Sequence, residues 1–173
     1  MIRCVLFDRD GTLGALGDDR YPQSFVPFCD IKEVFTRIKS LGYFVGVITN
    51  QASIARGTGN EYDFGKEFSS YGCDVWKICP HDSSDDCDCR KPKSGLLIAA
   101  ASELNLTPKE CLVVGDRMGD VTCAVSVGAY AALTLTGKGE AERSAVANAY
   151  PNTPVLRRFD DVISLLNSYR TDG

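Results

Sequence analysis

Short, nearly continuous apolar runs rich in branched residues recur along the chain, and the first two end directly in a polar residue. Strands that are buried on both faces of a parallel sheet have this composition, because neither face meets water. The pattern therefore predicts a parallel sheet of about five principal strands. They are expected at residues 3–8, 44–49, 74–78, 111–115 and 130–135.

Helical patterns lie between these predicted strands. From Ile31 to Leu41, apolar residues recur at three- and four-residue spacing, and Gly42 provides a stop. Further helices are expected at residues 94–106, 120–127 and 159–166. Strands that alternate with helices indicate right-handed βα units. We therefore predict an α/β fold with a doubly wound, Rossmann-like parallel sheet and helices on both faces.

Length and composition limit the class of protein. The 173 residues, 44% of them hydrophobic and 24% charged, suit one globular domain spanning residues 1–173. Apolar runs stay well below the roughly 20 residues of a membrane span, and Asp8 comes too early for a signal peptide. The net charge of -4 provides no overall attraction for a nucleic-acid backbone. We expect a cytoplasmic monomer with no membrane or nucleic-acid partner.

Polar residues follow the predicted strands at the edge where such sheets bind ligands. Asp8 and Asp10 come directly after the first strand, Thr49 and Asn50 end the second, and Asp116 follows the fourth. One carboxylate can act as a nucleophile and a second as general acid and base. A solvated acidic loop is the ordinary alternative for the first pair alone. The convergence of three strands favours one catalytic site.

Two later clusters add charges to this edge. Arg90 and Lys91 come just before a predicted helix, where cations are ordinarily disfavoured by the helix dipole, so a bound anion would explain them. Asp116 and Asp120 stand four residues apart at a strand-to-helix turn. Hard carboxylate oxygens of this kind suit magnesium.

Three of the eight cysteines share a short stretch with the one histidine. Cys79, His81, Cys87 and Cys89 supply the ligand set of a closed, tetrahedral Cys₃His zinc site, within a loop at residues 79–89. Such a site leaves no position for water, so its zinc is structural. Reduced cysteines beside a chance histidine are the alternative. The other cysteines are scattered and are interpreted as ordinary thiols: Cys4, Cys29, Cys73, Cys111 and Cys123.

Taken in order, the clusters from Asp8 to Asp120 resemble the haloacid dehalogenase (HAD) superfamily of phosphohydrolases. The family pattern is Asp-x-Asp-Gly-Thr, then Thr or Ser, then Lys, then Gly-Asp-x-x-x-Asp, and residues 8–12, Thr49, Lys91 and residues 115–120 match it. The metal loop followed by Arg-Lys-Pro is similar to the capless, zinc-bearing subgroup that contains heptose-bisphosphate and histidinol-phosphate phosphatases. The resemblance implies a magnesium-dependent phosphatase with a structural zinc.

The resemblance also implies roles for the residues that match. Asp8 would attack phosphorus and form an aspartyl phosphate, and Asp10 would protonate the leaving oxygen and then activate water. Thr49 and Lys91 would grip the phosphoryl group. Asp120 would orient Lys91 or a magnesium-bound water.

The magnesium ligands are implied in the same way. They would be a carboxylate oxygen of Asp8, the backbone carbonyl of Asp10 and the carboxylate of Asp116. The zinc loop directly precedes Arg90 and Lys91, and its zinc would fix the position of these two basic side chains.

Too few residues follow Thr12 and Asn50 for a large cap domain, so selectivity is expected from the loops at 13–28, 52–60 and 79–89. Asn50, Arg56 and Arg90 are the candidate substrate-binding residues. A small phosphorylated metabolite is expected, and a sugar phosphate or bisphosphate of the heptose type is favoured.

Sequence features point to two different substrates. Residues 51–57 and 135–139 resemble the heptose enzyme, whereas the five-residue gap between His81 and Cys87 resembles the histidinol-phosphate domain. Less favoured alternatives are a polynucleotide 3'-phosphatase and an inactive, zinc-stabilised binding protein.

Overall fold

Six parallel strands form one sheet in the computed structural model, which describes residues 1–16 and 21–171. The five predicted strands are confirmed, with ends that differ from the prediction by at most one residue. A sixth strand, β8, extends the edge of the sheet, and its two residues are too few to produce a sequence pattern. The strands are β1 (Cys4–Phe7), β4 (Phe44–Asn50), β5 (Val75–Cys79), β6 (Cys111–Gly115), β7 (Tyr130–Thr134) and β8 (Val155–Leu156).

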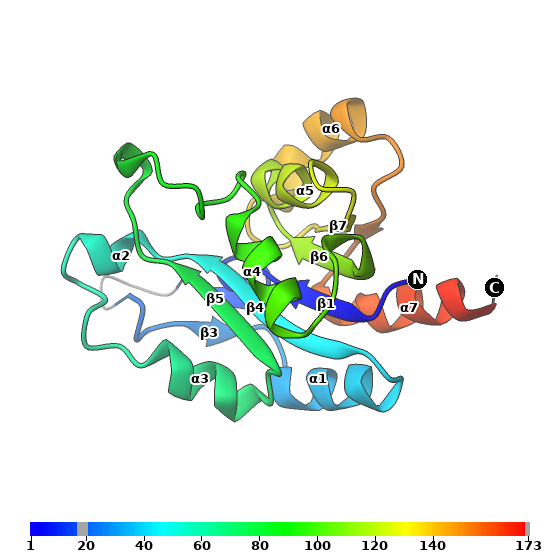
Figure 1. Ribbon diagram of the computed structural model, residues 1–173, viewed down its shortest axis with the longest axis horizontal. Helices are drawn as coiled ribbons and strands as arrows, with labels where there is room; N and C mark the ends of the chain where they lie inside the picture. Colours follow the sequence, from blue (N-terminus) through cyan, green and yellow to red (C-terminus); the bar gives the residue numbers. More distant parts are fainter. Residues whose placement is uncertain (17–20, 172–173) are drawn as a thin grey trace.

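The strand order places one crevice at the middle of the sheet. The order is β5-β4-β1-β6-β7-β8, and Cys4 of β1 is in register with Phe44 of β4 and Cys111 of β6 (Figure 1). The chain therefore builds outward on one side of β1 and then returns to build on the other side. Ligands bind at such a switch point, beyond the carboxyl ends of the strands.

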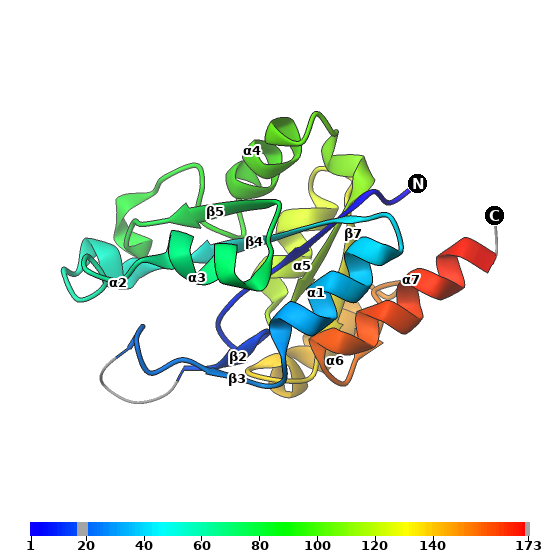
Figure 2. The same ribbon diagram turned by 90° about the horizontal axis from the view of Figure 1, so that it is seen from below.

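Alternation along the strands divides the core between the two faces. Val5 and Phe7 pack into one cluster with α1, α3 and α7, whereas Cys4 and Leu6 pack into the other with α4, α5 and α6. Figures 1 and 2 show the helices on opposite sides of the sheet. These helices are α1 (Ile31–Ser40), α3 (Phe64–Tyr71), α4 (Gly95–Glu103), α5 (Met118–Val125), α6 (Gly139–Ala149) and α7 (Val162–Thr171). The predicted doubly wound fold is confirmed.

Helix α6 was not predicted, because only Val146 and Gly139 are buried and the helix has no clear apolar stripe. Short elements complete the chain. They are the antiparallel pair β2 (Gly14–Ala15) and β3 (Val26–Pro27), the helix α2 (Ala52–Ala55), and 3₁₀ turns at Ser83–Asp85, Pro108–Glu110 and Phe159–Asp161.

The segment after Thr12 forms the β2–β3 hairpin in place of a large cap domain. Residues 17–20 of the predicted selectivity loop at 13–28 lie outside the described residues. Among the residues that the structure describes, no helix is both long and apolar enough to cross a membrane.

Candidate active site

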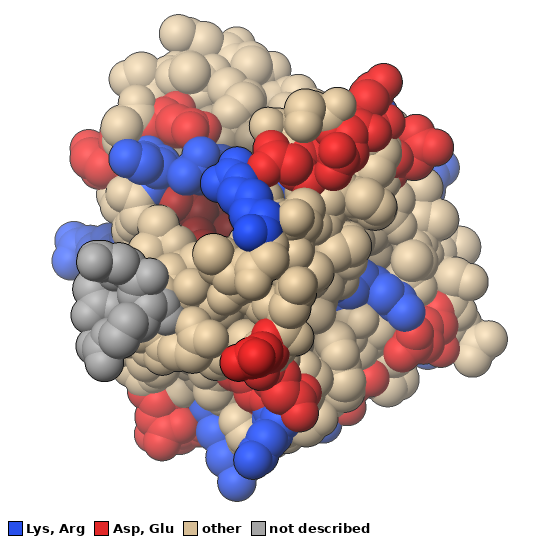
Figure 3. Space-filling model, turned by 90° about the vertical axis from the view of Figure 1, so that its left-hand side faces the viewer, with Lys and Arg blue, Asp and Glu red and all other residues tan. Residues whose placement is uncertain are grey.

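A cavity of about 760 Å³ opens at the carboxyl ends of β1, β4 and β6. Figure 3 looks onto this end of the molecule and shows basic side chains beside a recess that contains acidic ones. Residues from each of the four polar clusters between Asp8 and Asp120 line the cavity. They are Asp8, Asp10, Asn50, Arg56, Arg90, Lys91, Asp116 and Asp120.

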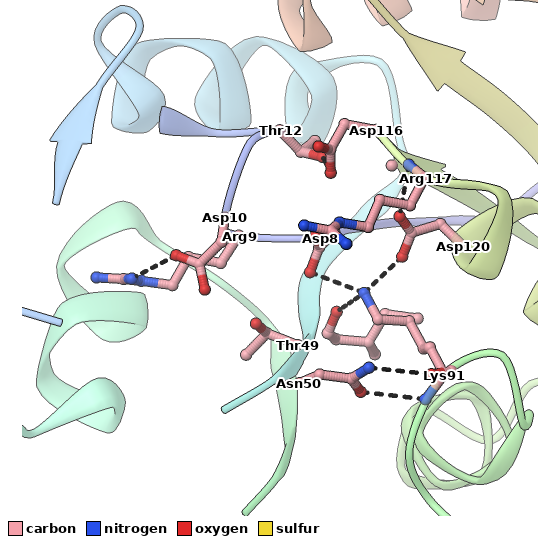
Figure 4. A network of polar contacts seen from close by, with 12 residues as sticks. Asp8, Arg9, Asp10, Thr12, Thr49, Asn50, Lys91, Asp116, Arg117 and Asp120 are labelled. Atoms are coloured by element: carbon pink, nitrogen blue, oxygen red, sulfur yellow. Dashed lines mark hydrogen bonds and ion pairs between the residues drawn. The ribbon is translucent and has the colours of Figure 1, made fainter. Parts of the chain in front are cut away.

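The Lys91 ammonium lies buried between two carboxylates (Figure 4). Its Nζ atom is 2.7 Å from Oδ1 of Asp8 and 2.6 Å from Oδ1 of Asp120, and it donates to the backbone oxygen of Ile48 at 2.9 Å. An ammonium has three donors, and all three have an acceptor here. The predicted grip of Lys91 on a phosphoryl group therefore requires one of these bonds to be exchanged.

Charge and burial oppose each other in this pair. Burial raises the pKa of Asp8 to about 8, against the opposing effect of Lys91, and the nearby carboxylates of Asp120 and Asp116 add to the rise. Burial disfavours the charged form of Lys91, but Asp120 and Asp8 outweigh it and raise the pKa of the ammonium. The single positive charge of Lys91 therefore does not balance the negative charges of Asp8, Asp116 and Asp120.

Asp116 is held by backbone that approaches it very closely. Oδ2 accepts a hydrogen bond from the backbone N–H of Lys138 at 2.8 Å, and Oδ1 accepts one from Thr12 at 3.3 Å. A Cβ atom at Gly11 would lie 2.3 Å from Oδ2, and one at Gly137 would lie 2.2 Å from it. Both glycines also have positive φ angles, so no other residue type fits this cradle.

The carboxylates fit a divalent cation. Oxygen atoms of Asp8, Asp116 and Asp120 lie within 4.8 Å of one another, and hard oxygen ligands are those that Mg²⁺ prefers. Both oxygens of Asp120 already have partners, because Oδ1 contacts Lys91 and Oδ2 accepts from the backbone N–H of Arg117. Both oxygens of Asp116 also have partners, Thr12 and the backbone N–H of Lys138. These contacts therefore do not select among the three acids, and the assignment of Asp8 and Asp116 as magnesium ligands stays a prediction.

The Asp10 carboxylate is held by three side chains. Oδ1 accepts a hydrogen bond from Nη1 of Arg9 at 2.7 Å, and Oδ2 accepts from Tyr21 at 2.6 Å and from Nε2 of Gln51 at 2.7 Å. The Tyr21 hydroxyl also contacts Oε1 of Gln51. Since 16% of the Asp10 side chain remains exposed, the carboxylate is still accessible from the cavity.

Arg9 contacts the Asp10 carboxylate and is not among the residues that sequence analysis selected. Its side chain is fully buried, and its Nε lies 3.0 and 3.1 Å from the two carboxylate oxygens of Glu67 on α3. Burial opposes the charge, but the hydrogen bond that Arg9 donates to Glu67 and the charge of Asp10 raise the pKa of Arg9. The available signal was an arginine placed between two acids at the end of a buried strand.

Thr49 and Asn50 have local partners. Thr49 is fully buried and is absent from the cavity lining, and its hydroxyl accepts a hydrogen bond from Gln51 at 2.9 Å. The Asn50 amide donates to the backbone oxygen of Lys91 and accepts from the backbone N–H of Lys91, both at 3.1 Å. Asn50 thus holds the peptide that carries Lys91, a role that sequence analysis did not predict.

The four predicted zinc ligands converge at the end of β5. Sγ of Cys79 is 3.6 Å from both Sγ of Cys87 and Nδ1 of His81, and Sγ of Cys89 is 3.4 Å and 3.3 Å from these same two atoms. Tetrahedral zinc with Zn–S bonds of about 2.3 Å separates two sulfur ligands by about 3.8 Å and a sulfur from a nitrogen by about 3.5 Å. The donor set and its spacing therefore fit a structural zinc.

The two candidate substrate-binding arginines line the cavity and contact the zinc loop. Arg56 is 64% exposed and its Nε lies 2.6 Å from Oδ2 of Asp82, and this hydrogen bond lowers the pKa of Asp82 to about 2. Nη1 of Arg90 donates to the backbone oxygen of His81 at 3.1 Å. Both arginines therefore link the rim of the cavity to the metal loop.

Similar proteins share one activity in their names. A HAD-hydrolase-like family model matches residues 88–162. The D-glycero-beta-D-manno-heptose-1,7-bisphosphate 7-phosphatase of Pseudomonas putida is 31% identical over 175 residues, which cover 95% of this chain and 97% of that enzyme. The enzyme of the same name from Haemophilus influenzae is 30% identical over 182 residues, which cover 92% of this chain and 99% of that enzyme.

Solved structures share the fold. The crystal structure of D,D-heptose 1,7-bisphosphate phosphatase from B. bronchiseptica, complexed with magnesium and phosphate, matches with a TM-score of 0.81 at 24% identity. The match covers 97% of this chain and 99% of that one. The corresponding enzyme from Burkholderia thailandensis matches with a TM-score of 0.67, also at 24% identity, over 96% of this chain and 99% of that one.

The pKa of Asp8, raised from 3.8 to about 8, predicts a pH-dependent stability of the metal-free protein. This contribution is fully present below about pH 4 and is lost as the pH rises through about 8, because the unfolded chain releases the proton that the folded chain retains. Mg²⁺ competes with that proton. We expect magnesium to raise the Tm more at about pH 8 than at about pH 5. In Asp8→Asn the difference between the two pH values should shrink; equal gains in the wild type would contradict the assignment.

Proposed function

This chain belongs to the HAD-like phosphatases that include the D-glycero-D-manno-heptose-1,7-bisphosphate 7-phosphatases, and from that membership we propose that it hydrolyses the 7-phosphate of a heptose 1,7-bisphosphate. That it is a phosphatase follows from the family. The observation that carries the chemistry is the convergence of Asp8, Asp116 and Asp120 on the buried Lys91 at the floor of one cavity. We further propose that residues 1–173 form one hydrolase domain.

In the first proposed step, a carboxylate oxygen of Asp8 attacks phosphorus. The bond between phosphorus and the sugar oxygen breaks, the electron pair goes to that oxygen, and Asp10 donates the proton that converts it to an alcohol. Lys91 holds a phosphoryl oxygen once one of its three present bonds is exchanged, whereas the Thr49 hydroxyl, buried outside the cavity lining, is left out of this step. The products of this step are the free sugar hydroxyl and an aspartyl phosphate on Asp8.

In the second step, water attacks the phosphorus of the aspartyl phosphate. Asp10, now ionised, accepts a proton from that water, and the bond between phosphorus and Asp8 breaks to release phosphate. Magnesium held by Asp8, the carbonyl of Asp10 and Asp116 supplies, when bound, positive charge that offsets the carboxylates and the phosphoryl oxygens. Asp120 keeps Lys91 in place through both steps.

Zinc is proposed for the cluster of Cys79, His81, Cys87 and Cys89, with a structural role. Arg90 and Lys91 directly follow this cluster, and Arg90 contacts the backbone of His81. Because zinc binding is coupled to the folding of its loop, the metal would fix the segment from which Lys91 reaches the carboxylates.

The rim arginines are proposed to recognise the second phosphate or the sugar hydroxyls. Arg56 meets this requirement because its ion pair with Asp82 is solvent-exposed, and exposed pairs of this kind contribute little to stability. A substrate phosphate can therefore compete for the guanidinium. Arg90 lies closer to Lys91, so it would influence the reacting phosphate as well.

Heptose 1,7-bisphosphate and magnesium provide the direct test of this function. We expect release of one phosphate, the one on C7, and its loss in Asp8→Asn, because the amide is no longer a nucleophile. Nuclear magnetic resonance of phosphorus identifies which phosphate leaves. Histidinol phosphate is the comparison substrate. Faster turnover of histidinol phosphate, or full activity in Asp8→Asn, would contradict the proposal.

We expect the protein purified without chelator to carry about one zinc ion, which elemental analysis measures. Cys87→Ser should lose the metal and lower both Tm and phosphatase activity, since the loop before Lys91 loses its cross-link. Cys29→Ser is the matched control, because Cys29 is also partly exposed but lies outside the cluster. Zinc-free wild-type protein with full activity and an unchanged Tm would contradict the structural role.

Removal of Arg56 tests distal recognition. A lost hydrogen bond to a charged group costs about 1.5–3 kcal/mol, so Arg56→Ala should lower kcat/KM for the bisphosphate about ten- to a hundredfold. The kcat/KM for 4-nitrophenyl phosphate should change little, because this ester has no second phosphate. Arg143→Ala is the control, since Arg143 is similarly exposed and pairs with Glu140 outside the cavity lining. Equal losses for both esters would count against distal recognition.

A further inference from the structure

Arg9 is an unusually well-compensated buried cation. Its side chain is fully buried, and both oxygens of Glu67, whose side chain is only 7% exposed, lie within 3.1 Å of its Nε. Aromatic rings surround the guanidinium, with the ring centre of Phe25 3.9 Å from Cζ and that of Phe64 5.4 Å away. A buried arginine placed between an acid pair and aromatic faces is fixed in one orientation.

The fixed guanidinium directs Nη1 at Asp10, which in turn lines the cavity. Nη1 lies 2.7 Å from Oδ1 of Asp10, while Nη2 donates to the backbone oxygen of Pro22 at 3.3 Å. Glu67 belongs to α3, and Pro22 and Phe25 belong to the segment that directly precedes β3. Arg9 therefore joins the first strand, α3 and this segment at the point where Asp10 stands.

The carboxylate of Asp10 has little freedom left. An ionised carboxylate offers about four lone-pair positions, and Arg9, Tyr21 and Gln51 take three of them. About one position remains for a proton that is exchanged with substrate or water. Such an arrangement fixes the direction in which the proton can be delivered.

We propose that Arg9, anchored by Glu67, is a positioning residue that orients Asp10 for donation of a proton to the leaving oxygen. This inference deepens the proposed function and rests on it. Arg9 does not touch the phosphoryl group in this assignment. It acts through Asp10, and Glu67 acts through Arg9.

The consequence for catalysis depends on the leaving group. When a sugar oxygen leaves, the electron pair of the broken bond must be met by a proton from Asp10, because an alkoxide is a poor leaving group. A 4-nitrophenolate leaves without that proton. Misorientation of Asp10 should therefore slow the release of an alkyl oxygen and largely spare the release of 4-nitrophenolate.

The test compares kcat/KM for two esters, 4-nitrophenyl phosphate and the primary sugar phosphate that the wild type hydrolyses fastest. This parameter covers the steps up to departure of the leaving group, so it excludes hydrolysis of the aspartyl phosphate. The ratio of the two values, measured on one preparation, does not depend on the fraction of folded enzyme. In Arg9→Met we expect the alkyl value to fall about a hundredfold and the aryl value only a few-fold.

Further variants separate positioning from folding. Glu67→Gln keeps the shape of the anchor and should shift the ratio in the same direction, by about tenfold. Asp10→Asn should reproduce the ratio of Arg9→Met. Asp74→Asn is the matched control, because Asp74 is a part-buried acid that pairs with Lys39 outside the cavity lining, and its ratio should equal that of the wild type.

Each outcome decides a different point. An unchanged ratio in both Arg9→Met and Glu67→Gln, with or without loss of total activity, would overturn the positioning role. An unchanged ratio in Asp10→Asn would overturn the proton donor and this inference with it. A wild type that hydrolyses other sugar phosphates but leaves heptose 1,7-bisphosphate intact would overturn only the proposed substrate.

Discussion

The ammonium of Lys91 is the charge around which the site is organised. It lies buried within hydrogen-bonding distance of Asp8, which follows β1, and of Asp120, which stands in the first turn of α5 after the neighbouring strand β6. Without it, these carboxylates would face one another in a poorly solvated space, and a buried acid left unpaired costs several kcal/mol. The parallel sheet brings the acids together, and Lys91 makes their proximity tolerable.

The position of Lys91 depends in turn on two supports from the neighbouring strands. The amide of Asn50, at the end of β4, holds the Lys91 peptide at both its N–H and its carbonyl. The cluster that begins at Cys79, the last residue of β5, closes the loop just before it. The proposed metal cross-link at this place would restrict the loop, so the position of the Lys91 charge would not rely on packing alone.

The sequence predicted the groups of residues that lie close together in the chain, and it did not predict contacts between residues far apart in the chain. Asp8, Asp116 and the cysteine cluster stand at fixed spacings beside recognisable strands. The order of the parallel strands then brings Asp8 and Asp116 together. The partner of Arg9 is Glu67, 58 residues away on a different helix, and no spacing rule connects them. Asn50 was expected to bind substrate; it lines the cavity, and its amide also satisfies backbone groups of Lys91, which the sequence did not predict. Such pairings follow from three-dimensional packing, which cannot be read from residue spacing in a single sequence.

The buried side chains of Arg9 and Lys91 connect the rim of the cavity to different acids, Asp10 and Asp8. Tyr21 lies in the segment before β3 and contacts Asp10 directly, and the neighbouring ring of Phe25 covers Arg9. On the other side, the zinc loop leads straight into Lys91, which contacts Asp8. A site without a large cap must recognise substrate through such rim segments. Because each segment also holds one of the side chains proposed for catalysis, binding at the rim and alignment of the proposed acid, Asp10, and the proposed nucleophile, Asp8, would depend on the same contacts.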